Sequence, residues 1–344
     1  MSGFLKWYEK NGTADAIAVS SRVRLARNLA GYPFPHAASG EQKKEILEKV
    51  LEACRDLDQL GLSLTYYAME GLSDTVRLQL AEHHLVSSEF IRQSAGRGVL
   101  VSADESVSIM IGEEDHIRIQ VVQAGLELEK ALELAMAIDN VLEEKLTFAF
   151  DDTYGYLTAC PTNIGTGMRA SVMLHLFGMD QLSLVARLAS TVSKMGLIIR
   201  GTYGSSTKTR GHDYLISNQV SLGIEESQAV TNLKSIVTQI IRQELSAQHE
   251  CINNRAAFED SLFRTLGQMK YARRMSYEEL CENVSLLRVG ICQKAIAIRP
   301  HVLSTLLLTT GPAAICGETE TIPGAAERDA KRAKAVQAAL ADTE

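Results

Sequence analysis

The sequence is short of long apolar runs, paired cysteines and positive charge. No stretch of the 344 residues is apolar enough to cross a membrane, and the opening "MSGFLKWYEKNG" has no apolar run after its positive charge. We therefore expect a cytoplasmic protein with no membrane partner. The six cysteines are scattered with no CxxC pair, which argues against both a disulfide framework and a zinc site, so we predict no metal site built from the chain.

The charge balance is acidic, with a formal net charge of -7 at pH 7. Proteins that bind nucleic acid without sequence preference need a basic surface to neutralise phosphates, so we expect no direct nucleic-acid partner. Any anion site must instead be a local cluster of arginines. With 46% hydrophobic residues, the chain is long enough for one large domain or two unequal ones.

The middle of the chain mixes strand-like segments with amphipathic helices, which predicts an α+β domain over residues 15–247, after an N-terminal tail of residues 1–14. The strand-like segments are "GVLVSA", "VSIMIG", "HIRIQVV", "KLTFAF" and "LIIRG". A helix is expected to begin after Ser39 and to end at Gly61. From about residue 225 the pattern is helical, with a capping box from Ser276 to Glu279, so residues 248–344 are predicted to form a helical C-terminal domain.

The first candidate functional segment is "AVSSRVRLARNL". On a strand, alternate residues share a face, so Ser20, Arg22 and Arg24 would point one way. Val19, Val23 and Leu25 would point the other way. Two arginines and a hydroxyl on one side suit an anion; the alternative is an ordinary solvated sheet face.

A second segment, "IGEEDHIRIQVV", alternates in the same way. It would place Glu114, His116 and Arg118 on one face of a strand, with Glu113 and Asp115 pointing away from Glu114. The alternative is a plain cross-strand salt bridge.

Two further segments each carry one arginine. "LTACPTNIGTGMRASVMLHL" is interpreted as a strand, a glycine loop and then a helix whose first turn holds Arg169, an arrangement suited to phosphate or carboxylate. It is not a Walker A loop, because no Gly-Lys-Ser/Thr follows. In "LIIRG", a helix ending at Gly196 leads into a strand with Arg200 at its end. Several cations that converge on phosphates are the main requirement of phosphoryl transfer.

Four segments, "SSRVRLAR", "EEDHIRIQ", "CPTNIGTGMRAS" and "RGTYG", resemble signatures of the ATP:guanido phosphotransferases, the family of creatine kinase and arginine kinase. The resemblance spans about residues 15–247. It implies a glutamine-synthetase-like catalytic domain, an antiparallel sheet flanked by helices, that uses ATP and Mg2+. The chain resembles the bacterial protein-arginine kinase branch most, because small-molecule members carry a separate helical domain before the arginine strand. That branch transfers the ATP γ-phosphoryl group to arginine side chains of proteins.

By position, the resemblance implies a catalytic glutamate at Glu114 and a reactive cysteine at Cys160. A guanidinium is protonated and has no free lone pair, so attack on the γ-phosphoryl group requires a carboxylate that aligns it and accepts its proton. "GEEDH" replaces the family's common "NEEDH", a departure at Gly112. The implied ATP-binding residues are Ser20, Ser21, Arg22, Val23, Arg24, His84, Arg118, Arg169, Ala170, Ser171, Val172, Met173, Arg200, Gly201, Thr202, Tyr203, Gly204 and Ser205.

The last helix contains "RDAKRA", which matches the RDxxRA motif that recognises phosphoarginine in the protein-arginine kinases. The implied residues are Arg328, Asp329, Arg332 and Ala333. An ordinary exposed helix with alternating charge is the alternative. The resemblance further implies a homodimer, a stress-response role, a heat-shock repressor among the substrates, an activator protein and an ATP-dependent protease.

The sequence departs from the family after "RGTYG". Arginine kinases and protein-arginine kinases usually carry a glutamate there, and often a second one three residues on, to hold the substrate guanidinium. Here these positions are Ser205 and Lys208. Creatine kinase also lacks the first acid, so activity is not excluded. Two alternatives stay open: an adaptor of weakened activity that binds nucleotide or phosphoarginine, and a kinase of a free guanidino compound.

Overall fold

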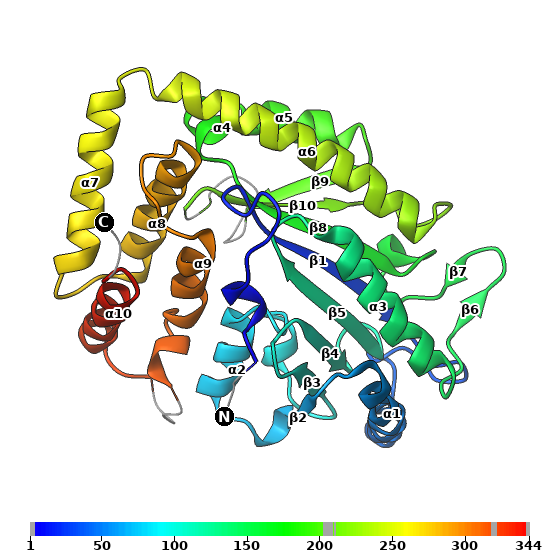
Figure 1. Cartoon of the computed structure of the whole chain (residues 1–344). Coiled ribbons are helices and arrows are strands. Elements are labelled where there is room, and N and C mark those ends of the chain that lie inside the picture. Colours follow the sequence, from blue (N-terminus) through cyan, green and yellow to red (C-terminus); the bar gives the residue numbers. More distant parts are fainter. Residues whose placement is uncertain (1–3, 202–208, 210, 318–321, 342–344) are drawn as a thin grey trace.

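The computed structural model describes residues 4–201, 209, 211–317 and 322–341. Its centre is an antiparallel sheet of eight strands in the order β2-β3-β4-β5-β1-β8-β10-β9 (Figure 1). The central strands alternate apolar residues with polar ones, as expected of a sheet with two different faces. In spatial order the strands are Leu64–Ala68, Gly98–Ser102, Val107–Ile111, Ile117–Ala124, Ala18–Arg27, Met168–His175, Asp213–Asn218 and Leu197–Gly201.

One face of the sheet packs on helices and forms the main hydrophobic core. Val23 and Leu25 of β1 lie in this core with Ala170 and Val172 of β8, all fully buried. Figure 1 shows α3 and α6 crossing this face. The helices of residues 40–251 are α1 (Gly40–Cys54), α2 (Asp74–Glu82), α3 (Leu128–Glu143), α4 (Phe177–Gln181), α5 (Val185–Ser193) and α6 (Glu226–Cys251).

The opposite face is only partly covered. Over β3 and β4, a smaller apolar cluster that includes Leu80 of α2 and Phe90 packs on Val99 and Met110. Over β5, Val122 contacts Trp7 and Leu308, which come from the two ends of the chain. The arginines predicted from the sequence lie on this face too, on β5 and on the strands β1, β8 and β9 beyond it in the sheet order.

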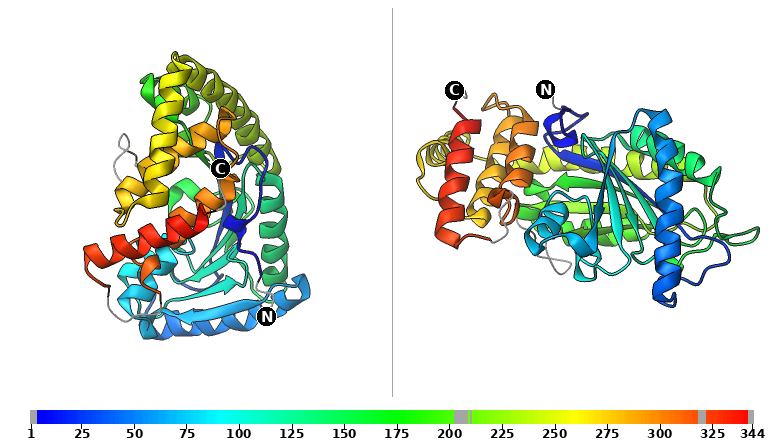
Figure 2. Two further views of the ribbon diagram at one scale, coloured as in Figure 1. Left: turned by 60° about the vertical axis from the view of Figure 1, so that its left-hand side comes forward. Right: turned by 90° about the horizontal axis from the view of Figure 1, so that it is seen from below.

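The C-terminal helices form a second core beside the sheet, as Figure 2 shows. They are α7 (Arg255–Tyr271), α8 (Tyr277–Cys292), α9 (Pro300–Thr309) and α10 (Ala325–Ala339). The capping box predicted at Ser276 is confirmed, as is the cap at Ser39. The predicted boundary near residue 248 lies inside α6, which runs on to Cys251. The N-terminal tail joins the two regions: Thr305 donates a hydrogen bond to the Tyr8 carbonyl at 3.3 Å.

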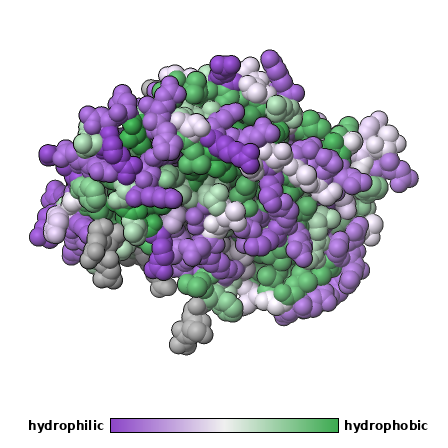
Figure 3. All heavy atoms as spheres, turned by 45° about the horizontal axis from the view of Figure 1, so that its top comes forward, coloured by the Kyte–Doolittle hydropathy of each residue, from purple (hydrophilic) through white to green (hydrophobic). Residues whose placement is uncertain are grey.

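The outer surface that bears α6 mixes charged and apolar side chains (Figure 3). Within the described part of the chain, no helix combines the length and the apolarity that a membrane crossing requires. Cys54, Cys160, Cys251 and Cys292 are free thiols.

Three predicted elements differ from the structure in type or in extent. Residues 168–175, predicted as a helix, form β8, and Arg169 therefore stands on a central strand. The predicted strand "HIRIQVV" begins only at Ile117, because residues 112–116 form the turn that joins β4 to β5. "KLTFAF" also lies mostly outside the sheet: Phe150 and Asp151 form β6, which pairs with β7 (Gly155–Tyr156) in a separate hairpin.

Candidate active site

The arginines meet because three neighbouring strands present them on the same face. In antiparallel pairs, directly opposed residues share a face. Arg24 of β1 stands opposite Arg169 of β8, and Arg22 stands opposite Ser171. On the other side of β1, Ala26 stands opposite Arg118 of β5. We call this surface the arginine face; the predicted pairing of Arg22 with Arg24 on one side of a strand is confirmed.

A cavity of about 310 Å³ opens on the arginine face. It brings together four of the five predicted arginines with both residues predicted to be catalytic, although they come from five separate segments. Its lining consists of Arg24, Ala26, Glu114, Arg118, Cys160, Thr162, Asn163, Gly167, Arg169 and Arg200.

Arg22 and Arg24 are cations without anionic partners. Within the described residues neither forms an ion pair with a carboxylate, and the Nε atoms of both are buried without a hydrogen-bond partner, as is Ser171 Oγ. Burial, with Arg118 and Arg169 nearby, lowers the pKa of Arg22 to about 10. Burial, then Arg22, Arg118 and Arg169, lower the pKa of Arg24 well below its ordinary value. A bound polyanion would supply the missing negative charge.

Arg27, on the same strand, has the opposite environment. Its side chain is fully buried on the core side, where Nη2 pairs with Asp139 Oδ2 at 2.7 Å. Nη1 donates to the carbonyls of Ala26 and Thr166 at 2.9 and 3.0 Å, and the guanidinium lies 3.5 Å from the centre of the Tyr156 ring. The charge of Arg27 is thus used in folding, whereas those of Arg22 and Arg24 are available to a ligand.

Two adjacent glutamates surround Arg118. Glu113 is buried, pairs with Nη1 of Arg118 and accepts a hydrogen bond from Ser87. Glu114 contacts Nη2 at 3.3 Å, but its side chain is 47% exposed at the cavity. The expectation that Glu113 points away from the site is therefore wrong. Glu113 holds the arginine, which leaves Glu114 available to a second cation.

The turn that carries Glu114 is anchored on both sides. Asp115 accepts hydrogen bonds from Asn28 Nδ2 and from the Ala159 amide, both at 2.7 Å. His116 accepts a bond from the Leu29 amide and, through Nε2, donates to the Pro33 carbonyl, both at 2.9 Å. His116 is buried, which lowers its pKa, so its predicted place beside Glu114 and Arg118 is wrong.

Gly112 opens this turn with φ of +79°. Glycine adopts this conformation at little cost, and asparagine is the side chain that tolerates it best. The departure from "NEEDH" to "GEEDH" is therefore compatible with the same backbone.

The segment from Cys160 to Gly167, which we call the Cys160 loop, forms another wall of the cavity. Cys160 Sγ lies 3.0 Å from Thr162 Oγ1, and Arg169 Nη2 lies 3.4 Å from both Thr162 Oγ1 and Asn163 Oδ1. Gly167, with φ of +64°, passes so close to β1 that a side chain there would clash with the Ala26 carbonyl. Close backbone packing thus places Cys160 beside Arg169.

Comparisons with known proteins identify the relatives of this arrangement. Residues 45–247 match the family model of the ATP:guanido phosphotransferase C-terminal catalytic domain, and residues 255–344 match the protein-arginine kinase McsB C-terminal domain. The chain belongs to the ATP:guanido phosphotransferase family. It is 40% identical over 338 residues to the protein-arginine kinase of Halothermothrix orenii, covering 97% of this chain and 96% of that protein. It is 38% identical over 341 residues to that of Brevibacillus brevis, with coverage of 97% and 94%.

Solved structures of family members share the fold. Lombricine kinase superposes with a TM-score of 0.60 and 26% identity, covering 71% of each chain. The duplicated taurocyamine kinase from Schistosoma mansoni, with bound transition-state analogue components, gives 0.62 and 26%, covering 81% of this chain and 41% of that one. The predicted fold class, an antiparallel sheet flanked by helices and followed by a helical region, is confirmed.

Several residues that the family resemblance implied as ATP ligands turn their side chains elsewhere. Val23, Ala170 and Val172 point into the core on the opposite face. Ser21 is also buried away from the arginines: its hydroxyl donates to the Gly125 carbonyl at 2.8 Å and accepts from the Glu127 amide at 2.9 Å. These side chains cannot reach a ligand on the arginine face.

His84 borders a second, smaller cavity of about 40 Å³. Ser20 and Met173 also line it, and so does Val19, which was expected to point the other way. The reason is a register shift between Ala18 and Ser20, where β1 pairs with β8. Burial, then Arg22 and His83, lower the pKa of His84 to about 4, so its ring is neutral near pH 7.

The loop that follows β9 falls mostly outside the described residues. The predicted ligands Thr202, Tyr203, Gly204 and Ser205 lie there, as does Lys208. Arg200 precedes the loop as an exposed residue at the end of β9, beside Gly201.

The C-terminal motif on α10 is largely buried. Arg332 is 1% exposed, donates to the carbonyls of Thr310 and Met275 at 2.9 and 2.8 Å, and pairs with Asp329 at 2.7 Å. Ala333 belongs to the C-terminal core. The alternative of an exposed helix with alternating charge is wrong for Arg332 and Ala333, whereas Arg328 and Asp329 are partly exposed.

Sequence reasoning missed Glu113, Asp115, Thr162 and Asn163. The only signal for Glu113 and Asp115 was their place in an acidic run next to the predicted base. Thr162 and Asn163 follow Cys160 in a loop with proline and glycine, and such loops often carry polar ligands.

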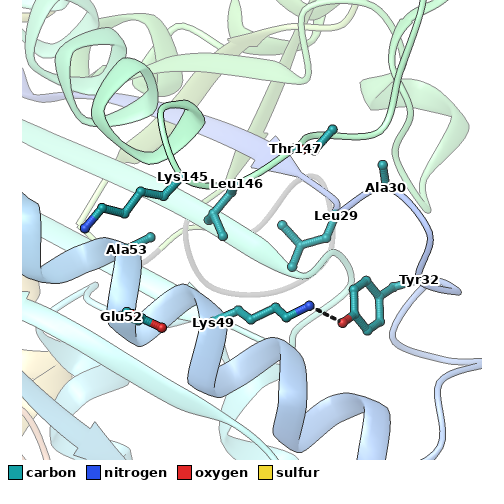
Figure 4. A pocket seen from close by; sticks show the side chains of 9 residues that line it. All are labelled: Leu29, Ala30, Tyr32, Lys49, Glu52, Ala53, Lys145, Leu146 and Thr147. Carbon is teal, nitrogen blue, oxygen red and sulfur yellow. Dashed lines mark hydrogen bonds between the residues drawn. The ribbon is translucent and has the colours of Figure 1, made fainter.

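A larger cavity of about 420 Å³ lies elsewhere, between α1 and the chain beyond β1 and α3 (Figure 4). Its two lysines are already paired. Lys49 donates to the Tyr32 hydroxyl at 2.6 Å and pairs with Glu45 at 3.1 Å, and Lys145 pairs with Asp56 at 2.6 Å. The larger cavity thus has its cations compensated, whereas the cavity on the arginine face lies beside cations that are not.

The described residues contain no group of three or more His, Cys, Asp and Glu side chains that could hold a metal ion. Mg2+ in kinases is usually held by one or two carboxylates together with nucleotide phosphates. Glu114, half-exposed at the cavity, is the carboxylate that fits such a shared site, whereas Glu113 is buried against Arg118.

Proposed function

We propose that this chain is an ATP- and Mg2+-dependent protein-arginine kinase. The observation that carries the proposal is that Arg22 and Arg24 form no ion pair with any carboxylate of the described residues and lie on the same face as the half-exposed Glu114. Positive charge without a partner suits the phosphates of ATP, and an available carboxylate suits the guanidinium of a substrate arginine. The two named relatives, similar over nearly their whole length, are protein-arginine kinases.

The reaction then proceeds in one transfer. Arg24, Arg118 and Arg169 hold the phosphates and stabilise the charge of the transferring group. Glu114 aligns the substrate guanidinium and accepts the proton that its attacking nitrogen loses. The nitrogen forms a bond to the γ-phosphorus while the bond to the β,γ-bridging oxygen breaks, and ADP leaves. Mg2+, when bound with ATP, offsets phosphate charge.

The proposal is tested by incubation with ATP, Mg2+ and an arginine-rich protein. Wild type should form acid-labile phosphoarginine, and Glu114→Gln should reduce the rate about 10²–10⁴-fold while ATP still binds, because proton transfer is lost and the arginines remain. Glu133→Gln, an exposed change on α3, is the matched control. Equal rates for wild type and Glu114→Gln would show that Glu114 is not the base.

The sequence at Ser205 and Lys208 favours one competing function, a nucleotide- or phosphoarginine-binding adaptor. In that case wild type binds ATP but transfers no phosphate, and Ser205→Glu alone creates activity. Robust turnover by wild type excludes the adaptor. Free arginine and creatine, included as substrates, separate the protein kinase from a kinase of a free guanidino compound.

The remaining roles follow from the family and from the C-terminal match. We propose residues 15–247 as the catalytic domain and residues 248–344 as the helical domain for dimerisation and phosphoarginine sensing, through Arg328 and Asp329. The cellular setting that we propose is the bacterial cytoplasm, where marked proteins, a heat-shock repressor among them, pass to an ATP-dependent protease and an activator protein assists.

A further inference from the structure

Exposed apolar side chains gather next to the candidate active site. Among the described residues twelve large hydrophobic side chains are exposed, and five of them lie in three short segments around one loop. Phe150 and Tyr154 belong to the β6–β7 hairpin, Val220 and Leu222 follow β10, and Met195 precedes β9. We call Phe150, Tyr154, Val220 and Leu222, which are 46–56% exposed, the apolar rim.

The apolar rim is built onto the loop that lines the cavity. The Tyr156 amide donates to the Gly165 carbonyl at 2.8 Å, and the Thr166 amide donates to the Ser221 carbonyl at 3.0 Å. Ser221 Oγ donates to the carbonyls of Thr162 and Ile164 at 3.0 and 2.8 Å. The hairpin and the segment after β10 thus hold the Cys160 loop from two sides.

Glycines make this contact possible. A side chain at Gly155 would clash with the Gly165 carbonyl, and one at Gly165 would clash with the Ser221 carbonyl. Three backbone segments therefore lie in direct contact, so the position of the apolar rim is fixed relative to Thr162 and Asn163 in the cavity wall.

The hairpin is preformed. Asp151 Oδ1 accepts hydrogen bonds from the amides of Thr153 and Tyr154, at 2.8 and 3.0 Å, and so fixes the turn that presents Tyr154. The Phe150 ring lies 5.2 Å from that of Tyr156, which in turn lies over Arg27. A rigid hairpin that keeps aromatic side chains exposed is a feature of binding surfaces rather than of folding.

The charge around the rim favours a basic partner. Neither residues 146–168 nor residues 211–233 contain a lysine or an arginine. Asp152 of the hairpin and Glu225 at the start of α6 are exposed. The rim is therefore apolar and acidic, next to a cavity whose own charge is positive.

We propose that the apolar rim binds the polypeptide on either side of the target arginine, in particular extended segments with apolar side chains near that arginine. This inference rests on the proposed function and specifies its substrate class. The continuity of the rim with the cavity wall is what identifies the occupant, because the rim segments hydrogen-bond to the loop that supplies Thr162 and Asn163 to that wall. A chain whose arginine enters the cavity therefore comes close to the rim.

The test uses two labelled peptides, one with its arginine between leucine and phenylalanine, and one with its arginine between glycine and serine. Wild type should prefer the first in kcat/KM and in affinity measured by fluorescence anisotropy. Leu222→Ser and Tyr154→Ser should each lower both values about tenfold for the apolar peptide, since each removes one partly buried side chain from the complex, and should leave the glycine-serine peptide unchanged. Leu78→Ser, an exposed change on α2, is the matched control.

Failure of the rim and failure of the proposed function give different results. If wild type phosphorylates neither peptide, the proposed function fails, and affinity alone then decides on the rim. Equal affinity of wild type for both peptides overturns the inference, as does equal loss for both peptides in the variants. A change of oligomeric state in Leu222→Ser, with peptide affinity unchanged, would assign the rim to a second copy of the chain and overturn the inference as well.

Discussion

Replacement of Arg22 by methionine should make the ligand-free protein more stable. Near pH 7 a buried cation with a lowered pKa destabilises the folded state, because the unfolded chain holds the same proton more tightly. The lowering of the Arg22 pKa from its ordinary value to about 10 corresponds to about 3 kcal/mol, at about 1.4 kcal/mol for each pH unit. Since Arg22 is partly exposed, we expect a gain of about 1–3 kcal/mol for Arg22→Met.

The same substitution at Arg27 should have the opposite effect. Arg27→Met leaves the Asp139 carboxylate buried without its partner, and loss of one member of a buried ion pair typically costs about 3–5 kcal/mol. Arg22 and Arg27 lie five residues apart in the sequence. The expected changes in the free energy of unfolding nevertheless have opposite sign and differ by about 4–8 kcal/mol.

The measurement is chemical unfolding followed by fluorescence of Trp7, the single tryptophan, which belongs to the N-terminal tail and is buried against Val122 of β5 and Leu308 of α9. Arg22→Lys keeps the charge and should gain little stability. ATP with Mg2+ should raise the midpoint of wild type more than that of Arg22→Met, because the variant has lost one of the cations of the arginine face while Arg24, Arg118 and Arg169 remain. The reasoning is refuted if Arg22→Met loses as much stability as Arg27→Met.

Two further predictions concern histidine and the C-terminal motif. As the pH falls from 6.5 to 4, His84 takes up a proton in the unfolded chain but not in the folded chain, so the free energy of unfolding should fall by up to about 3 kcal/mol. Chemical unfolding at pH 7 and pH 4.5 should show this loss in wild type and not in His84→Gln. Arg332→Met leaves the carbonyls of Thr310 and Met275 without their donor, which should cost about 1–3 kcal/mol of stability for each unsatisfied group. The loss should appear as faster hydrogen exchange in α8 and α10. The control variant Arg328→Met should leave exchange unchanged.

Sequence patterns predicted the two sides of β1 correctly from Arg22 onward, because alternation is a direct consequence of strand geometry. The same rule could have found β8. Met168, Ala170, Val172 and Leu174 alternate with polar or larger residues, and all four are almost fully buried. The helix prediction for Arg169 gave more weight to the glycine loop before it than to this alternation.

The turn at Glu114 could not be predicted from alternation. The period-two pattern of β5 continues backward on paper through His116 to Glu114, but the strand begins at Ile117. What ends it is a set of contacts distant in sequence: His116 bonds to Leu29 and Pro33, and Asp115 bonds to Asn28. Local pattern contains no information on such partners.

The same limit applies to the assignment of charge. β1 contains three arginines of the same residue type. Alternation places Arg27 on the side of the core residues Val23 and Leu25, where an unpaired charge would be very costly, but it does not show what neutralises that charge. Its partner Asp139 is 112 positions away on α3, so the pairing is visible only in the fold. Arg22 and Arg24 differ from Arg27 in having no such carboxylate among the described residues. It is this difference in charge compensation, rather than the residue type, that commits Arg27 to the fold and leaves Arg22 and Arg24 available to an anionic ligand.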